Sequence, residues 1–333
     1  MEYRIIRKDL KVSGIGLGCM GMSHAYGAPS DHREMSRLLA DAVRIGYTFF
    51  DTAEVYGTST DPHDNEKLLG EGLKPYRNEV VIATKFGLTF GEKLPNGMYS
   101  LVPDSKPETI RMAVEGSLRR LQTDHIDLYY QHRVDPEVSP ETVAEVMADL
   151  IKEGKILHWG VSEAQEDYIR RAHAVCPMTA IQNRYSMMAR WNESLFPMCK
   201  ELGIGFVAFS PLANGLLTNS YTADSKFDPT TDYRASMPQY TKEGFDKNRQ
   251  LLDLIASLAE SHNATSSQIS LAWMICKEPF IVPIPGTRTV SRLEENAGAS
   301  EIKLSASEVE DIDKRLSEMS MSDVFGGNNT VKN

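Results

Sequence analysis

Short apolar runs recur along the chain, and most of them do not alternate apolar with polar residues. Continuous apolar runs are typical of strands that are covered on both faces, as in a parallel sheet. The runs are "GIGLGCM" near residue 14, "GYTFFDT" near 46, "VVIATKFG" near 80, "HIDLYYQH" near 125, "HWGVSE" near 158, "AIQNRY" near 180, "GIGFVAFSPL" near 203 and "FIVPIPGT" near 280. Each run is therefore predicted to form one strand of a parallel sheet.

Helical periodicity fills intervals between these runs. Residues 35–43, 107–121 and 141–151 each place apolar side chains on one face, and Pro107 is a favourable first helical residue. Strand and helix alternate about eight times, which predicts an α/β fold of the closed (β/α)8 TIM barrel type. A doubly wound open sheet is the alternative. No composition shift marks a boundary, so residues 1–320 are expected to form a single domain.

Some segments lie outside this repeat. Residues 213–243 form a long polar connection after the seventh strand, and long ordered loops are often functional. The segment "TFGEKLPNGMYSL" after the third strand is a shorter example. An extra C-terminal helix is expected near residues 306–318. Residues 321–333, which end in "GGNNTVKN", are expected to form a flexible tail.

Composition and charge narrow the class of protein. The chain has 333 residues, with 36 Lys and Arg against 46 Asp and Glu, which gives a formal net charge of -10. This acidic balance argues against sequence-independent nucleic-acid binding but is compatible with a local basic pocket for an anionic ligand. No apolar run approaches the roughly 20 residues of a membrane-spanning helix, and the first residues show no signal-peptide pattern. We therefore expect a cytoplasmic protein with no membrane partner.

The cysteine spacing agrees with that compartment. The four cysteines are far apart in the sequence and form no CxxC pair, so reduced thiols are expected and no metal site is predicted. They are Cys19, Cys176, Cys199 and Cys276. The sequence pattern predicts no particular oligomeric state.

Polar side chains stand at the ends of three successive predicted strands. Asp51 ends the second strand, and Tyr56 follows in the loop. Lys85 ends the third strand, and His132 ends the fourth. Each residue alone has an ordinary structural explanation, such as a cap, an ion pair or a hydrogen-bonded histidine. In a (β/α)8 barrel, however, the active site lies at the carboxyl ends of the strands, so the four side chains should converge on one mouth.

The chemistry of these four groups fits proton donation to a carbonyl oxygen. A free tyrosine has a pKa of about 10, and a nearby ammonium group stabilises the phenolate form. Lys85 can supply that ammonium, and Asp51 can hold it in place and keep it charged. Tyr56 is then a usable general acid, while His132 can orient a substrate carbonyl. A hydride must come from a cofactor, because no side chain donates one.

At this point the sequence resembles the aldo-keto reductase superfamily, from about residue 10 to residue 300. The resemblance is carried by "FFDTAEVYG", "VVIATKFG", "DHIDLYYQHR", "GKILHWGVSEA" and "VAFSPLANGLL", and their combination is specific. It implies a (β/α)8 barrel with a nicotinamide cofactor across the mouth. It also implies a catalytic tetrad of Asp51, Tyr56, Lys85 and His132, and the reduction of small aldehydes or ketones to alcohols.

The cofactor end can be examined separately in "IPGTRTVSRLEEN", residues 284–296. Amides at a helix N-terminus with Arg288 and Arg292 nearby would favour a phosphate. A capping box of Ser291 and Glu294 is the purely structural alternative. The resemblance implies that this segment binds the adenosine and its 2′-phosphate, which favours NADPH/NADP+ over NADH. The residues implied there are Gly286, Thr287, Arg288, Arg292, Glu295 and Asn296.

The resemblance implies further contacts at the nicotinamide end and for the substrate. Ser162 and Gln182 match positions that hold the nicotinamide amide. The other implied cofactor contacts are Gly18, Met20, Phe209, Ser210, Pro211 and Leu212. Substrate contacts are expected from Met22, Tyr26, Phe86, Trp191 and the 213–243 segment.

The sequence departs from the commoner family pattern at two positions. Glu163 follows Ser162 where many members have asparagine, and a carboxylate there could weaken an amide-binding contact. Phe209 replaces a stacking tyrosine and should still stack. A literal GxGxxG at residues 16–21 is rejected as a dinucleotide-binding turn, because no convincing helix follows it.

The sequence thus predicts an NADPH-dependent oxidoreductase that acts on a small carbonyl substrate. Two other classes stay open. One is a cofactor-sensing interaction subunit on the same fold, although the intact tetrad argues against a purely binding role. The other is a barrel aldolase that uses Lys85 as a Schiff base, against which the neighbouring Asp51 argues because it favours the charged lysine.

Overall fold

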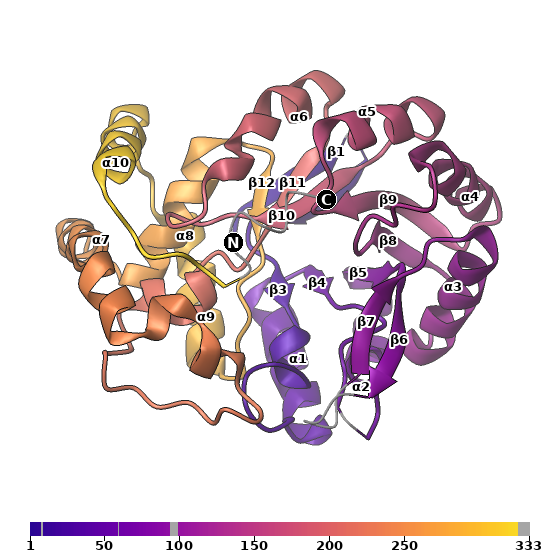
Figure 1. Cartoon of the computed structure of the whole chain (residues 1–333), viewed down its shortest axis with the longest axis horizontal. Coiled ribbons are helices and arrows are strands. Elements are labelled where there is room, and N and C mark those ends of the chain that lie inside the picture. The colour runs from indigo at the N-terminus through magenta and orange to yellow at the C-terminus, as the bar shows by residue number, and fades with distance from the viewer. Residues whose placement is uncertain (8, 59, 94–98, 326–333) are drawn as a thin grey trace.

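A curled sheet of eight parallel strands lies at the centre of the molecule, with helices around it (Figure 1). The computed structural model describes all residues except 8, 59, 94–98 and 326–333. In order around the sheet, the strands are β3 (Leu17–Gly18), β4 (Phe49–Asp51), β5 (Val81–Phe86), β8 (Ile126–Gln131), β9 (Ile156–Ser162), β10 (Ala180–Arg184), β11 (Gly205–Phe209) and β12 (Ile281–Pro283). The backbone N–H of Gly16 donates to the carbonyl of Pro283 at 2.9 Å, which joins the first strand to the last. The predicted (β/α)8 barrel is confirmed.

Ten α-helices lie in the described part of the chain, and α1 shows how capping residues set their ends. They are α1 (His32–Ile45), α2 (Asp64–Leu73), α3 (Pro107–Leu121), α4 (Pro140–Lys152), α5 (Glu166–Val175), α6 (Phe196–Leu202), α7 (Lys242–Ser261), α8 (Ser266–Lys277), α9 (Val290–Gly298) and α10 (Ala306–Glu318). Asp31 caps α1 by accepting hydrogen bonds from the N–H groups of Arg33 and Glu34, and Gly46 ends it at a φ of 108°. Helix α10 confirms the expected C-terminal helix. In the part of the chain that is described, no helix combines the length and apolarity needed to cross a bilayer.

An N-terminal hairpin, which the sequence pattern did not predict, covers the amino end of the barrel. It consists of β1 (Tyr3–Arg7) and β2 (Leu10–Ser13). Ile6, Leu10 and Val12 are buried there in one cluster with inward-facing strand residues such as Leu128 and Val207. The hairpin therefore fills the end opposite to the strand carboxyl ends with apolar side chains.

The long segment after the seventh strand is ordered and lies over the mouth. It contains three short 3-10 helices, η4 (Ala213–Thr218), η5 (Tyr233–Ser236) and η6 (Pro238–Tyr240). Backbone hydrogen bonds join it to the loop after β3, from Gly27 to the carbonyl of Thr231 at 3.0 Å and from Tyr233 to that of Ala25 at 2.9 Å. The connection is therefore held in place by the loop that follows the first strand of the barrel, β3.

Two other expected departures from the repeat are partly visible. The segment after the third strand forms a hairpin of β6 (Leu88–Lys93) and β7 (Tyr99–Pro103). The ordered chain extends beyond residue 321, because Ser322 bonds to Asn248 and Val324 is buried. The first residues of the predicted tail therefore pack against the barrel, and the rest of it, 326–333, lies outside the described residues.

The packing of the N-terminal hairpin against the barrel predicts how substitutions in β1 change stability. Ile6 is 2% exposed and Ile5 is 63% exposed, although they are neighbours on the same strand. Ile6→Ala should lower the free energy of unfolding by about 2–4 kcal/mol, because a buried aliphatic side chain leaves a cavity. Ile5→Ala is the matched control and should change it by less than about 0.5 kcal/mol. Urea unfolding of the two variants measures the difference, and equal values would show that the hairpin does not seal the barrel.

Candidate active site

A buried ion pair connects the ends of two neighbouring strands. The Nζ of Lys85, on β5, donates to Oδ1 of Asp51 at 2.5 Å and to the carbonyl of Thr52 at 2.7 Å. Lys85 is 1% exposed. Burial alone lowers the pKa of Lys85, but the charge of Asp51 and the phenol of Tyr56 outweigh it, so the pKa is raised. The side chain is therefore an ammonium ion at neutral pH.

Tyr56 lies directly beside this ion pair. The Nζ of Lys85 is 5.0 Å from the centroid of the Tyr56 ring. The rings of Tyr56 and His132 pack edge to face, with their centroids 5.6 Å apart. The loop that carries Tyr56 is fixed at both sides, since its N–H donates to Ala53 at 3.1 Å and its carbonyl accepts from Asn65 at 3.0 Å. The four residues predicted as a tetrad are thus brought together.

His132 is neutral and has one nitrogen without a partner. Its backbone N–H donates to the carbonyl of Phe86 at 2.7 Å, which fixes the end of β8. Burial lowers the pKa of His132 well below its usual value, and the positive charges of Arg133 and Lys85 lower it further. Its Nδ1 is buried with no hydrogen-bond partner among the described residues. A neutral imidazole carries one N–H donor, which can point at a substrate oxygen.

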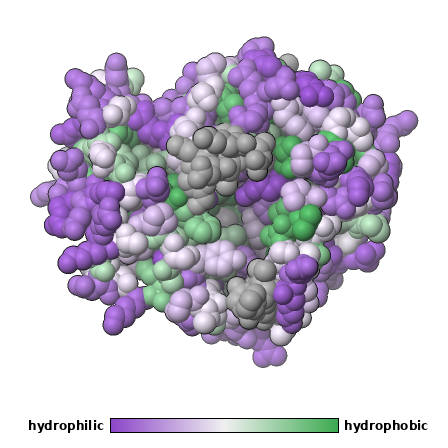
Figure 2. Space-filling model, viewed as in Figure 1, coloured by the Kyte–Doolittle hydropathy of each residue, from purple (hydrophilic) through white to green (hydrophobic). Residues whose placement is uncertain are grey.

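These groups open into a cavity of about 800 Å³ at the carboxyl ends of the strands. In the space-filling view, apolar residues gather near the centre of this face and hydrophilic residues cover its periphery (Figure 2). The predicted residues that line the cavity are Gly18, Met20, Tyr26, Asp51, Tyr56, His132, Ser162, Gln182, Phe209, Ser210, Pro211, Leu212, Gly286, Thr287, Arg288 and Arg292. Three residues predicted for the tetrad and the cofactor do not line the cavity. Lys85 is buried next to Asp51 and Tyr56, and Glu295 and Asn296 belong to α9.

Two polar residues assigned to the nicotinamide amide already have partners. Gln182 Nε2 donates to Oδ2 of Asp51 at 2.7 Å, and Ser162 Oγ accepts from Arg133 at 3.3 Å. Glu163 adopts a φ of 56°, and its Oε1 accepts from the backbone N–H of Arg184 at 2.9 Å. The carboxylate at this unusual position thus fixes the end of β10.

Three of the four residues predicted as substrate contacts do not line the described cavity. Met22 and Phe86 are buried, and Phe86 packs on Tyr129 with ring centroids 4.7 Å apart. Side chains alternate along a strand, so Lys85 faces the barrel interior and Phe86 faces the helices. Trp191, in η3 (Trp191–Leu195), packs against the same core. Only Tyr26 of this set lines the cavity among the described residues.

Several lining residues were missed by the sequence analysis. They include Arg133, Arg184, Tyr221, Tyr233, Arg234, Met237 and Phe325. A signal for Arg184 was present, because it follows Gln182 by two positions and residues so spaced share one side of a strand. The residues from the long segment had no such signal, since an irregular loop has no period.

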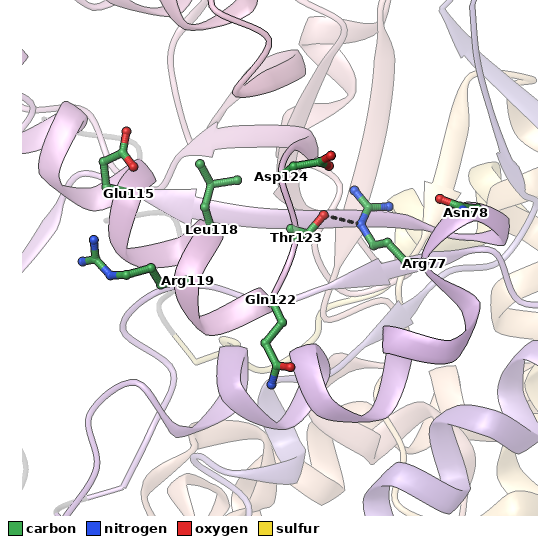
Figure 3. Close-up of a pocket in the computed structure, with 8 residues that line it drawn as sticks. All are labelled: Arg77, Asn78, Glu115, Leu118, Arg119, Gln122, Thr123 and Asp124. Atoms are coloured by element: carbon green, nitrogen blue, oxygen red, sulfur yellow. Dashed lines mark hydrogen bonds between the residues drawn. The ribbon is translucent and has the colours of Figure 1, made fainter.

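An open depression near the amino ends of β5 and β8 is a poor alternative site (Figure 3). Arg77 there donates to Oγ1 of Thr123 at 2.8 Å and pairs with Asp127 at 2.8 Å. The side chains of Glu115, Arg119 and Gln122 point away from one another. No group of three potential metal ligands was found among the described residues.

Comparison with known proteins agrees with this geometry. The model of the "Aldo/keto reductase family" matches residues 14–316. A protein from Glycine max, described as "Probable aldo-keto reductase 1", is 39% identical over 322 residues, which are 96% of this chain and 89% of that protein. A glycerol dehydrogenase from Gluconobacter oxydans has a similar structure, with a TM-score of 0.85, 27% identity and coverage of 95% of both chains. The holo form of an aldo-keto reductase from Bacillus halodurans gives a TM-score of 0.76 at 25% identity, covering 95% of this chain and 96% of that one.

The neutral state of His132 predicts a pH dependence of stability. Below its ordinary pKa of about 6.5, His132 gains a proton in the unfolded chain but not in the folded one, so stability should fall as the pH falls. His132→Gln should reduce this fall by up to about 1.4 kcal/mol per pH unit. Urea unfolding between pH 5 and 8 measures it.

His32 provides a control of opposite sign. Burial alone lowers its pKa, but hydrogen bonds and charge from Asp64 and Glu71 raise it overall. The protonated form of His32 therefore stabilises the fold below about pH 6.5, and this contribution disappears as the pH rises. His32→Gln should make the acid loss of stability steeper. If the free energy of unfolding of wild type and of His132→Gln changes with pH in the same way, His132 is not held neutral in the folded protein.

Proposed function

The chain belongs to the aldo-keto reductase family, and on that premise we propose that it reduces aldehydes or ketones to alcohols with NADPH. The observation that carries the proposal is the buried Lys85–Asp51 pair beside Tyr56, with the neutral His132 at the same cavity. These groups can bind a carbonyl oxygen and donate a proton to it. The nicotinamide, when bound, supplies the hydride.

Each side chain has one task in this mechanism. His132 donates a hydrogen bond to the substrate oxygen and orients the carbonyl. Tyr56 gives its phenolic proton to that oxygen as negative charge develops there. Lys85 stabilises the phenolate that remains, and Asp51 keeps Lys85 charged and in place. The pair is fixed before substrate binds, so little reorganisation is needed during the reaction.

The preference for NADPH is supported by two arginines near the start of α9. The Nη2 of Arg288 is buried without a partner among the described residues, while its other nitrogens donate to the carbonyls of Gly21 and Ala28. Arg292 is exposed one turn away and lines the cavity. An unpaired guanidinium nitrogen suits a phosphate oxygen. These residues would hold the 2′-phosphate of the cofactor.

The state of Lys85 argues against an aldolase. A Schiff base requires a neutral amine as nucleophile. The raised pKa of Lys85, in contact with Asp51, keeps it protonated, and its Nζ is already bound to two oxygens. Lys85 therefore serves Tyr56 rather than attacking a substrate.

The first functional prediction concerns the proton donor. Tyr56→Phe should lower kcat about 10²-fold or more and leave cofactor affinity unchanged, because only the proton is lost. Lys85→Met should also reduce kcat strongly, and the double variant should not show additive losses, since both changes act on one proton. The assay follows NADPH absorbance with a series of aldehydes and ketones, beside cofactor titration by fluorescence.

Tyr233→Phe is the matched control for that experiment. Tyr233 lines the same cavity, and its hydroxyl bonds to His24 rather than to the tetrad. Its kcat should stay within a few-fold of wild type, by the physical argument that no proton is transferred from it. A Tyr56→Phe enzyme that turns over at the wild-type rate would exclude Tyr56 as the acid.

The second functional prediction concerns cofactor choice. Replacing Arg288 and Arg292 together with alanine should weaken NADPH binding tenfold or more, since each charge-assisted hydrogen bond contributes about 1.5–3 kcal/mol. NADH binding should change much less, because NADH lacks the 2′-phosphate. Fluorescence titration of both cofactors gives the ratio. An equal loss for the two cofactors would place these arginines elsewhere on the ligand.

A further inference from the structure

Two more arginines line the cavity and have no acidic partner. Arg133 follows His132 at the end of β8, and Arg184 is the last residue of β10. Neither guanidinium forms an ion pair with any carboxylate in the described part of the chain. Arg133 and Arg184 stand at the ends of β8 and β10, whereas Arg288 and Arg292 follow β12, with β11 between β10 and β12. They are therefore separate from the arginines assigned to the 2′-phosphate.

Arg184 is the more deeply buried of the two. It is 8% exposed, and its Nε has no hydrogen-bond partner among the described residues. Its guanidinium carbon lies 5.0 Å from the centroid of Phe209. The carboxylate of Glu163 bonds to its backbone N–H and not to its guanidinium. Burial lowers the pKa of Arg184 overall, because it outweighs the nearby charge of Glu163, which raises the pKa. A bound anion in direct contact with the guanidinium would offset the remaining cost of burying this cation.

Arg133 brings a second positive charge next to the tetrad. Its Nη1 donates to the carbonyl of His132 at 2.6 Å and to Oγ of Ser162 at 3.3 Å, and both of these partners are uncharged. Burial lowers the pKa of His132 most, and the charge of Arg133 lowers it further. Burial also lowers the pKa of Arg184 most; Glu163 and Tyr26 oppose this, and Arg133 adds a smaller lowering. The two arginines and the catalytic histidine therefore lie close to one another.

No acidic residue that lines the described cavity pairs with Arg133 or Arg184. Apart from Asp51, no carboxylate residue belongs to the described lining, and Asp51 is already bound to Lys85 and Gln182. Arg234 differs from the other arginines because it pairs with Asp232. This part of the mouth is thus positive in a chain whose net charge is -10, and it attracts anions.

We propose that the substrate carries an anionic group, a carboxylate or a phosphate, a few bonds from its carbonyl, and that Arg184 and Arg133 bind this group. The inference rests on the proposed function, because it assigns the substrate class of the same site. With the carbonyl held at His132 and Tyr56, the anion extends toward the ends of β8 and β10. Charge-assisted contacts to guanidinium are short and directional, so they also fix which face of the carbonyl is presented.

The test compares matched anionic and neutral substrates. 4-Oxobutanoate is measured beside butanal for a carboxylate, and glyceraldehyde 3-phosphate beside glyceraldehyde for a phosphate. Wild type should prefer one anionic member of these pairs in kcat/KM. Arg184→Met should lose about tenfold to a hundredfold of kcat/KM for that member, mainly through KM, and stay within about twofold for its neutral partner. Arg133 also contacts His132 and Ser162, so Arg133→Met is expected to lose activity on both members of the pair, with the larger loss for the anionic one. Arg119→Met, which removes an exposed charge at the opposite end of the barrel, is the control and should change neither.

Each outcome decides the inference. Equal losses for charged and neutral substrates, or a weaker NADPH affinity in fluorescence titration, would show that these arginines serve the cofactor or the fold, and would overturn the proposal. If wild type reduces no carbonyl compound at all, the proposed function fails instead. The subsite is then judged by calorimetric titration with succinate and inorganic phosphate: binding that Arg184→Met abolishes supports it, and no binding to wild type refutes it.

Discussion

The contact between Lys85 and Asp51 fixes the arrangement of the whole mouth. Taking two opposite charges out of water is expensive, and their attraction offsets that cost only when other polar groups complete the site. Here the carbonyl of Thr52 accepts from Lys85, and Gln182 donates to the second oxygen of Asp51. Three strands, β4, β5 and β10, are thereby tied together across the barrel interior. Tyr56 follows β4, and His132, at the end of β8, is bonded through its backbone N–H to Phe86 at the end of β5.

The rest of the barrel encloses these polar groups at both ends. The N-terminal hairpin fills the amino end with apolar side chains, and the long segment after β11 lies over the carboxyl end. The side chains between them alternate, so one residue of a strand faces the centre and the next faces a helix. Low dielectric at the centre strengthens the interaction between the charged groups and any ligand.

The sequence indicated the repeat and the tetrad because both have strong local signals. Apolar runs marked the eight strands, and polar residues at their ends marked Asp51, Lys85 and His132. The hairpin was missed because β1 is short and mixes basic with apolar residues. Met22 and Phe86 do not line the cavity, because a residue next to a site in sequence can face the opposite side of the backbone. Arg184 could have been found from strand periodicity, whereas the contacts of the long segment depend on tertiary structure alone.

The path of the C-terminal segment has a practical consequence. After α10 the chain returns to the mouth, where the backbone of Phe325 bonds to Gln239 and its side chain lines the cavity. The first strand, in contrast, lies at the sealed end. A fusion partner or an immobilising linker attached before residue 1 would therefore leave the entrance clear. An attachment at the other end would extend a chain whose last described residue, Phe325, lies at the entrance, so N-terminal tagging is the better choice for assays and for biosensor construction.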